Sequence, residues 1–280
     1  MKDIKTNTLD GRMKTYEYVT RNYLTLGCPK IIRLDMRAGH TFTKGFKKPF
    51  DDVFSKSMIA ATKKLCEEIN GAVMGYTQSD EISIIINDIT DKGKFDCFFE
   101  GNISKIISIS ASICTLAFNK AYAEIVNELP PEEAEIYKKN LWSGQFDSRV
   151  FCLPNEMELH NYILWRQQDA TRNSIQMAGY THLSQTEMNN KDNSQVQDML
   201  MVKKGINWND YPTKFKRGCA IVKEQYQKDV QIPGRGLITG VERKHWVETE
   251  IPILTQDLDF IHKIYNRYLL INGELTKVNK

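Results

Sequence analysis

Short runs of apolar and β-branched residues, each bounded by polar or turn-forming ones, predict the β-strands of this chain. Four such runs lie in its first part, at residues 30–35, 73–77, 82–86 and 146–153. The second and third flank a short polar segment, and a connection of this kind joins antiparallel neighbours. We therefore expect a β-hairpin with Asp80 and Glu81 at its tip.

Apolar residues at helical spacing predict the helices. The segment 50–70 has a continuous apolar stripe, acids in its first turn and Gly71 after it, which are helix start and stop signals. Asn102 and Asn155 are expected to cap two longer helices. The predicted helices cover residues 13–26, 50–70, 102–128, 155–179 and 194–204.

The remaining segments are expected to be loops, short strands or turns. Residues 36–40 and 88–93 are predicted loops, and 95–99 is a predicted short strand. Near the end of the chain, 219–223 and 246–249 are the arms of a second predicted hairpin. Its turn is the glycine-rich segment 232–236.

The order of these elements predicts an α+β fold. From residue 30 to 153 it is β-α-β-β-α-β, the ferredoxin-like unit, in which the end of the first strand and the tip of the central hairpin share one sheet edge. Asp35 and Asp80 should therefore converge. We expect residues 1–153 to form a palm-like catalytic domain, as in nucleotide polymerases, and 154–280 a helical and hairpin region packed on it.

Composition changes this interpretation little. With 280 residues, 41% of them hydrophobic and 26% charged, the chain is typical of a soluble globular protein. A net charge of +3 alone does not indicate nucleic-acid binding, although local basic clusters leave it open. The six cysteines are dispersed, which favours reduced thiols over zinc ligands or disulfides. Without an apolar run near the roughly 18 residues that span a bilayer, and with a polar start, we expect a cytoplasmic protein with no membrane partner.

The acids carry the first functional hypothesis. An isolated Ser-Asp-Glu segment is more often a solvated turn, because Asp and Ser favour turns through local hydrogen bonds. Asp35, from a separate strand, favours a functional role for these acids instead. Carboxylates that meet at one sheet edge suit a hard divalent ion such as Mg²⁺. Two such ions would serve phosphoryl or nucleotidyl transfer. The loop 36–40 has backbone amides and a glycine that suit a triphosphate.

Six motifs in a fixed order extend this hypothesis. They are IIRLD at 31–35, HTF at 40–42, KP at 48–49, YTQSDE at 76–81, FDSR at 146–149 and WRQQD at 165–169. Together they resemble the tRNA(His) guanylyltransferase family, whose members polymerise in the 3'-to-5' direction. The tRNA(His) enzymes have His-Ile-Asn-Asn where this chain has TRNS at 171–174, so the resemblance is to the bacterial Thg1-like branch. That branch implies template-directed repair of truncated tRNA 5' ends.

The resemblance implies roles for named residues, with ATP, GTP and other nucleoside triphosphates as substrates and tRNA as partner. The expected catalytic residues are Asp35, Asp80 and Glu81, and the expected ligands of two Mg²⁺ ions are Asp35, Asp80 and the Met36 carbonyl. The expected nucleotide-binding residues are Met36, Arg37, Ala38, Gly39, His40, Lys48, Asp51, Ser79, Asn102 and Lys105. The expected tRNA-binding residues are Arg166, Arg172, Asn173, Lys214, Lys216 and Arg217.

Two positions depart from the family pattern. Met36 stands where the family has a glycine, and would be strained if its loop needed a positive φ. Gly39 replaces an aromatic residue and removes a packing or base-stacking surface. The alternatives are guanylate addition to tRNA(His), another palm chemistry such as a nucleotidyl cyclase, and tRNA binding without catalysis. The family also implies a homotetramer.

Overall fold

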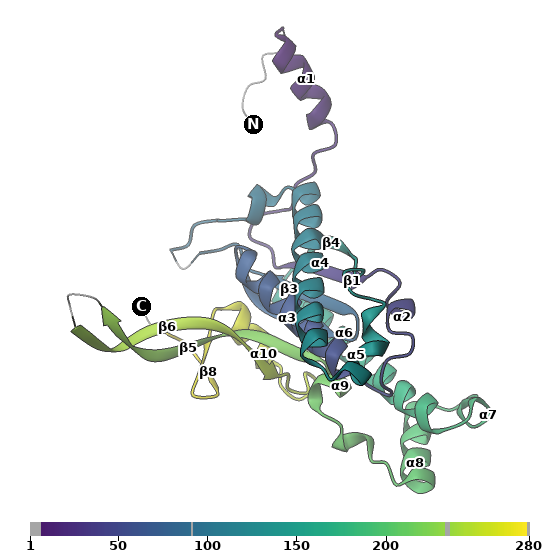
Figure 1. Ribbon diagram of the computed structural model, residues 1–280. Coiled ribbons are helices and arrows are strands. Elements are labelled where there is room, and N and C mark those ends of the chain that lie inside the picture. The colour runs from purple at the N-terminus through teal and green to yellow at the C-terminus, as the bar shows by residue number, and fades with distance from the viewer. Residues whose placement is uncertain (1–6, 91, 233–235, 279–280) are drawn as a thin grey trace.

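One mixed sheet organises the molecule (Figure 1). The computed structural model describes residues 7–90, 92–232 and 236–278. Within them eight strands follow the order β4-β1-β3-β2-β5-β7-β8, with β6 paired to β5. The strands are β1 Lys30–Met36, β2 Ala72–Gln78, β3 Glu81–Ile86, β4 Phe146–Cys152, β5 Cys219–Ile232, β6 Gly236–Glu250, β7 Leu269–Ile271 and β8 Glu274–Thr276.

Helices cover both faces of this sheet. The α-helices are α1 Leu9–Tyr18, α2 Gly39–Phe42, α3 Asp52–Glu68, α4 Ile103–Glu128, α5 Pro131–Lys138, α6 Glu156–His182, α7 Gln185–Met188, α8 Asn193–Lys204, α9 Thr213–Arg217 and α10 Asp259–Tyr265. Helices α3 and α4 pack on one face, and α6 and α10 on the other. The sheet therefore lies in the middle of three layers.

Side chains of β1 alternate between these two layers. Ile32, Leu34 and Met36 lie in the core under α3 and α4, whereas Ile31 lies in the core under α6 and α10. This is the period of two that a strand imposes. Asp35 is therefore on the α6 face, at the end of the strand.

The predicted α+β class and the β-α-β-β-α-β order are confirmed. Strand β1 lies between β3 and β4, antiparallel to both, and places Asp35 opposite Glu81. Asn102 and Asn155 cap α4 and α6 with their side chains, as predicted. Asp51, predicted to lie in the first turn of a helix from residue 50, is instead the N-cap of α3. The predicted domain boundary at residue 153 falls between β4 and α6, and the sheet continues across it through the β2–β5 pair.

Several local predictions were wrong. The first helix begins at Leu9 and ends at Tyr18, so it covers little of 13–26. Residues 95–99 form no strand in the described chain: Phe95 makes a single bridge to Ile89, and a 3₁₀ turn follows at Phe98–Gly101. The predicted loop 36–40 extends β1 and begins α2.

Other differences concern length and omission. The second hairpin is much longer than predicted, since β5 and β6 have 14 and 15 residues, and it projects as a ribbon (Figure 1). Part of its turn, 233–235, lies outside the described residues, as does residue 91 of the predicted loop 88–93. The helices α5, α7 and α10 and the pair β7–β8 were not predicted.

Helix α4 contains the longest apolar stretch. By length and composition it is the one helix in the described segments that could cross a membrane, which corrects the expectation that no apolar run approaches that length. Core helices pass the same test, and Cys114, Phe118 and Tyr122 of α4 are fully buried in the α3–α4 layer. Its apolar character is thus used in packing against the sheet.

Helix α3 crosses β2 at very close range. A Cβ added to Gly75 would lie 2.5 Å from Thr62 Cγ2 and 2.8 Å from Cys66 Sγ. Overpacking of this kind costs about 1–3 kcal/mol, so Gly75→Ala should lower the free energy of unfolding by that amount. Denaturant unfolding measures it.

A rescue variant tests the cause. Thr62→Ser and Cys66→Ala remove the two atoms that the new methyl group meets, and combining them with Gly75→Ala should recover part of the loss. If the combined variant lost the sum of the three single effects, close packing would not be the reason for Gly75.

Candidate active site

The tip of the β2–β3 hairpin brings Asp80 to the end of β1. The amide of Met36 donates a hydrogen bond to the Asp80 carbonyl over 3.0 Å, which fixes the tip against the strand end. Asp35 faces Glu81 across the β1–β3 pair. The predicted convergence of Asp35 and Asp80 at one sheet edge is what the backbone shows.

Gly39 makes room for the Asp80 carboxylate. A Cβ at position 39 would lie 2.1 Å from Asp80 Oδ2, so no side chain fits there while Asp80 keeps this position. Ala38, the N-cap of α2, and Ser79 both have positive φ, 53° and 49°. Met36 has no positive φ, and its replacement of a glycine therefore brings no backbone strain.

Burial raises the pKa of Asp80, and the negative charge of Asp35 raises it further. A hydrogen bond from Ser79, an amide hydrogen bond and the charge of Arg33 oppose the rise. The two carboxylates are thus close enough to repel each other in the absence of a cation.

Two arginines hold Asp35. Arg33, two residues earlier on the same strand face, places its Nε 3.2 Å from Asp35 Oδ2. Arg149 of β4 donates from Nη2 to Asp35 Oδ2 over 3.1 Å and to Asp147 over 3.1 Å. Arg149 is more than half exposed, so its guanidinium is also accessible to a ligand.

Glu81 joins the sheet to α6. Its Oε2 accepts hydrogen bonds from Arg33 over 2.7 Å and from Arg166 over 3.0 Å, and the Gln78 amide lies 3.3 Å away. Its other oxygen, Oε1, is buried and has no hydrogen-bond partner among the described residues. Burial raises the pKa of Glu81, while Arg33 and Arg166 oppose the shift.

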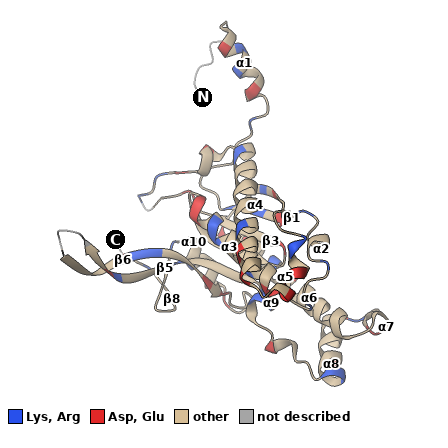
Figure 2. Ribbon diagram, in the orientation of Figure 1, with Lys and Arg blue, Asp and Glu red and all other residues tan. Residues whose placement is uncertain are grey.

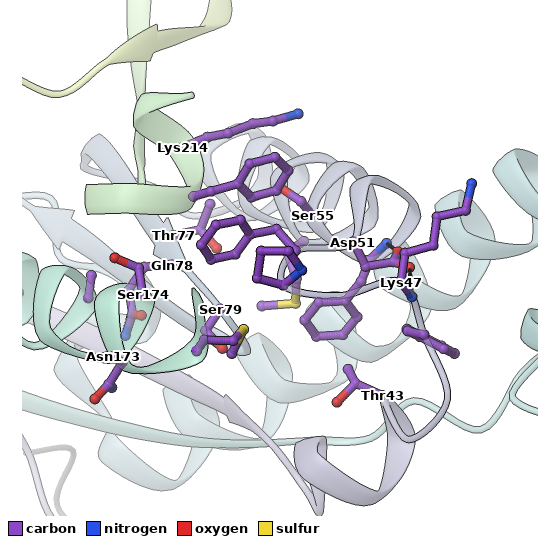
Figure 3. A pocket seen from close by; sticks show the side chains of 18 of the residues that line it. Thr43, Lys47, Asp51, Ser55, Thr77, Gln78, Ser79, Asn173, Ser174 and Lys214 are labelled. Carbon is purple, nitrogen blue, oxygen red and sulfur yellow. Dashed lines mark hydrogen bonds between the residues drawn. The ribbon is translucent and has the colours of Figure 1, made fainter. Parts of the chain in front are cut away.

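A cleft beside Asp80 collects several of the predicted residues (Figure 3). Lys48 and Asp51 line it from the segment before α3, and Ser79 from the tip between β2 and β3. Asn173 and Lys214 line it from α6 and α9. Its volume of about 860 Å³ includes space that is open to solvent. Predicted nucleotide-binding and tRNA-binding residues thus share one cleft.

The walls of the cleft are largely apolar. Phe50 stacks on Phe215 with 4.9 Å between ring centroids and 5° between planes, and Met58 and Met177 add apolar surface. Asp51 is held by Tyr137, whose hydroxyl donates to Oδ2 over 2.7 Å. Aromatic walls with a few fixed polar groups suit a heterocyclic base.

The exposed residues Arg37 and His40 flank this edge of the sheet. Arg37 Nη1 donates to Gln145 over 2.9 Å, and His40 lies in the first turn of α2, directly after Gly39. Arg37 precedes Gly39 in the chain and His40 follows it, so both lie near the Asp80 carboxylate that Gly39 contacts.

Asn102 and Lys105 lie at the other end of α4. Ser110 bonds Ser148, and Phe118 contacts Phe146, so the middle of α4 lies level with the end of β1. At 1.5 Å per residue, Asn102 is roughly 15 Å along the axis from the level of Asp35. Nucleotide binding by Asn102 and Lys105 therefore stays a prediction, and it requires a ligand that extends along the helix.

The predicted tRNA-binding residues differ in accessibility. Arg166 and Lys216 are buried, at 5% and 7% exposure, and bond to protein groups: Arg166 to Glu81, and Lys216 to the Asn209 carbonyl. Arg172 and Asn173 are exposed beside Asp169, to which both donate. Arg217 lies apart from the cleft, in a separate pocket between β5, β6 and α10.

Sequence reasoning missed Arg33 and Arg149 as site residues. Both lie inside motifs quoted above, and each is two residues from an acid, Asp35 or Asp147, on one strand face. The period of two is the signal that would have found them. Within the described segments no group of three or more His, Cys, Asp or Glu residues is arranged to hold a metal ion.

The raised pKa of Asp80 predicts a stability effect. A carboxyl group whose pKa is higher in the folded chain binds its proton more tightly there, so stability falls as pH rises through the raised pKa. Asp80→Asn should therefore raise the unfolding midpoint at pH 7, without divalent cations, by roughly 2–4 °C. The gain should shrink as pH falls toward 3.8, the ordinary value.

Thermal unfolding at pH 7 and pH 4 measures this effect, with exposed Asp198→Asn of α8 as the control. A destabilised Asp80→Asn at pH 7 would contradict the account of Asp80 as a half-buried carboxylate that Asp35 repels.

Comparison with known proteins identifies the family. The model of the Thg1 family, described as tRNAHis guanylyltransferase, matches residues 10–154. A solved bacterial tRNA(His) guanylyltransferase (Thg1)-like protein in complex with ATP is 36% identical, with a TM-score of 0.75, and the match covers 92% of this chain and 99% of that one. Another such structure, in complex with GTP, is 33% identical with a TM-score of 0.70 and the same coverage.

Curated relatives agree with this result. The tRNA(His) guanylyltransferase of Schizosaccharomyces pombe is 29% identical over 211 residues, which cover 71% of this chain and 75% of the relative. A probable tRNA(His) guanylyltransferase from Dictyostelium discoideum is 27% identical over 211 residues, which cover 71% of this chain and 76% of the relative. With more than half of its residues matched by the family model, the chain belongs to the Thg1 family, whose members are nucleotidyltransferases that act on tRNA.

Proposed function

We propose that this protein repairs truncated tRNA by adding nucleotides to its 5' end in the 3'-to-5' direction. The tRNA 5'-phosphate first attacks the α-phosphate of ATP or GTP and displaces pyrophosphate. The 3'-hydroxyl of an incoming nucleoside triphosphate then attacks the activated 5'-phosphate, and the nucleoside monophosphate leaves. The observation that carries the proposal is the meeting of Asp35 and Asp80 beside the cleft that Ser79 lines. The neighbours solved with ATP and GTP support these triphosphates as substrates.

The cleft is the proposed site of a nucleotide. Its base would lie among the aromatic walls, where Asp51 is fixed by Tyr137 and can accept a hydrogen bond from a base edge. Lys48, at the rim, and the backbone of the α2 turn would face the phosphates.

Asp35, Asp80 and the Met36 carbonyl are the proposed ligands of two Mg²⁺ ions. Oxygen donors alone suit this metal, and the repulsion between the two carboxylates is what a cation would relieve. When bound, such ions activate an attacking hydroxyl and stabilise the oxygens of the reacting phosphate.

The arginines position these groups. Arg33 and Arg149 orient Asp35 and leave cationic surface toward a triphosphate, and Glu81 fixes Arg33 against Arg166. In this proposal Glu81 therefore acts mainly by positioning Arg33 and Arg166. Its Oε1, which has no hydrogen-bond partner among the described residues, is the atom that could still contact a metal ion. Residues after 153 supply the tRNA contacts in this proposal, among them exposed Arg172 and Asn173. Lys214, which lines the cleft, is half-buried and paired with Asp52.

Two observations favour repair over guanylate addition specific to tRNA(His). The bacterial Thg1-like structures match this chain at 36% and 33% identity over 92% of its length, against 24% over 74% for the Saccharomyces cerevisiae tRNA(His) enzyme. The segment 171–174 also lacks the His-Ile-Asn-Asn sequence of the tRNA(His) enzymes. Choice of nucleotide would then come from pairing, which positions the attacking hydroxyl.

A homotetramer in the cytoplasm is part of the proposal. Exposed apolar residues support assembly: Leu116 of α4 is 67% exposed, and Leu9 and Tyr16 of α1 are 66% and 70% exposed on a helix that stands apart from the sheet (Figure 1). The six free thiols, all in the described segments, suit a reducing compartment.

A competition assay tests the function. Truncated tRNA(His) and other truncated tRNAs are incubated with Mg²⁺ and labelled nucleotides. Each tRNA is prepared in four versions that differ in the base opposite the missing nucleotide. We expect extension of several tRNAs by the nucleotide that pairs with the opposite base. Asp80→Asn should lower the rate of nucleotide addition at least roughly 100-fold, because losing a metal ligand costs more activity than losing a residue that orients a ligand. Extension of full-length tRNA(His) alone, with guanylate whatever base stands opposite, would assign the chain to the other branch.

Gly39 gives a second test in the same assay. Gly39→Ala places a methyl group on the Asp80 carboxylate, so it should lower nucleotide addition at least about 10-fold and raise the Mg²⁺ concentration needed. Thr41→Ala, on the exposed side of α2, is the matched control. Normal Mg²⁺ dependence in Gly39→Ala would show that the position of Asp80 is not critical.

A further inference from the structure

An exposed tryptophan lies in the loop 139–145, which links α5 to β4. Trp142 is 65% exposed, and among the described residues its indole forms no hydrogen bond, ring contact or cation contact. Its φ of 62° is a left-handed conformation, which is unfavourable for a residue with a Cβ. Neither core packing nor the proposed reaction accounts for this side chain.

Hydrogen bonds on both sides of Trp142 fix the loop. Asn140 Nδ2 donates to the Phe42 carbonyl over 2.8 Å. The Gly144 amide donates to Asn119 Oδ1 of α4 over 3.0 Å. The exposed indole is therefore carried by a loop that is anchored to α2 and α4.

The same loop borders the sheet edge where Asp35 and Asp80 meet. The Arg37 amide donates to the Gln145 carbonyl over 2.8 Å, and Arg37 Nη1 donates to Gln145 Oε1 over 2.9 Å. Gln145 is three residues after Trp142, a span of at most roughly 11 Å. Trp142 therefore lies close to the edge at which the proposed reaction takes place.

Cations without carboxylate partners accompany this loop. Lys139 Nζ donates to the Lys44 carbonyl over 2.8 Å, which brings the segment after α2 against the loop. Arg37, Lys44 and Lys139 are exposed and form no ion pair within the described chain. Figure 2 shows Lys and Arg, in blue, beside α2 and α5.

The acids of this region do not neutralise these cations. Residues 139–145 contain no acid. The carboxylates of Glu133 and Glu135 in α5 lie 2.9 and 2.8 Å from lysine ammonium groups, and that of Asp147 lies 3.1 Å from an arginine of its own strand. Glu132 is in the first turn of α5, roughly 10 Å along the helix from the loop.

We propose that Trp142 and the lysines beside it bind the single-stranded 3' end of tRNA. The inference rests on the proposed function, which places the tRNA 5' end at the Asp35–Asp80 edge. The opposite strand of the acceptor stem continues into unpaired nucleotides, which then pass this edge. Single-stranded bases stack on exposed aromatic side chains, and cations follow their phosphates. Trp142 stacks on one such base, while Lys44 and Lys139 face the neighbouring phosphates.

The test compares a tRNA truncated at its 5' end with the same tRNA after removal of its unpaired 3' nucleotides. Affinity for both is measured without nucleoside triphosphates, for the unmodified protein and for Trp142→Ala, Trp142→Phe and Lys44→Met. Phe95→Ala is the control, because Phe95 is 56% exposed at the opposite end of the sheet. Thermal unfolding checks the fold of each variant, and sedimentation its oligomeric state.

We expect Trp142→Ala to lose about 10-fold in affinity for the tRNA that keeps its 3' end, since one stacked base is lost. On the shortened tRNA it should match the unmodified protein, which itself loses about 10-fold when the 3' nucleotides are removed. Trp142→Phe should keep most of the affinity and Phe95→Ala all of it. In Lys44→Met the salt dependence should become shallower by roughly 0.7, the slope of one single-strand phosphate contact.

An equal loss by Trp142→Ala on both tRNAs, or no loss on the tRNA with its 3' end, would overturn the proposal. So would an altered oligomeric state in Trp142→Ala, which would identify the indole as a subunit contact. Binding is measured here without nucleotide addition, so failure of the repair assay leaves this result unchanged and the two proposals fail separately.

Discussion

The carboxylate of Glu81 connects the two parts of the chain on which the proposed active site depends. It accepts hydrogen bonds from Arg33 of the sheet and Arg166 of α6, and all three side chains are largely withdrawn from water. Removing one partner of such a group leaves a buried charge uncompensated, which is strongly destabilising. The position of α6, and with it one wall of the cleft, therefore depends on an ionic contact made at the sheet edge where Asp35 and Asp80 meet.

The same contact explains why the cleft is shared between the two parts of the chain. Lys48 and Asp51 come from the segment before and at the start of α3, whereas Asn173 and Met177 come from α6, more than a hundred residues later. Neither set makes a site alone. Nucleotide binding in this cleft, as proposed, is consequently coupled to the packing of α6 on the sheet. Variants of α6 that do not line the cleft are then expected to change nucleotide affinity.

Much of this arrangement was predictable from local patterns. The alternation in β1 and the polar tip between β2 and β3 predicted the strands, and the β-α-β-β-α-β order placed Asp35 and Asp80 at one edge. Burial of Arg166 and Lys216 was not predictable, because a motif rich in polar residues looks the same whether it faces tRNA or Glu81. The position of α4 along the sheet, which keeps Asn102 away from that edge, depends on tertiary packing that no local pattern encodes. The same holds for the short β7–β8 pair.

The two left-handed residues at this edge, Ala38 and Ser79, have a thermodynamic consequence for binding. Each adopts a conformation that is unfavourable for a residue with a Cβ, and the Met36–Asp80 backbone bond and the missing side chain of Gly39 hold the turns in that state. Turns already restricted in the free protein lose little conformational entropy when a ligand arrives. Less of the free energy of the proposed phosphate and metal contacts at this edge is then consumed in ordering the loops, and more of it appears as affinity.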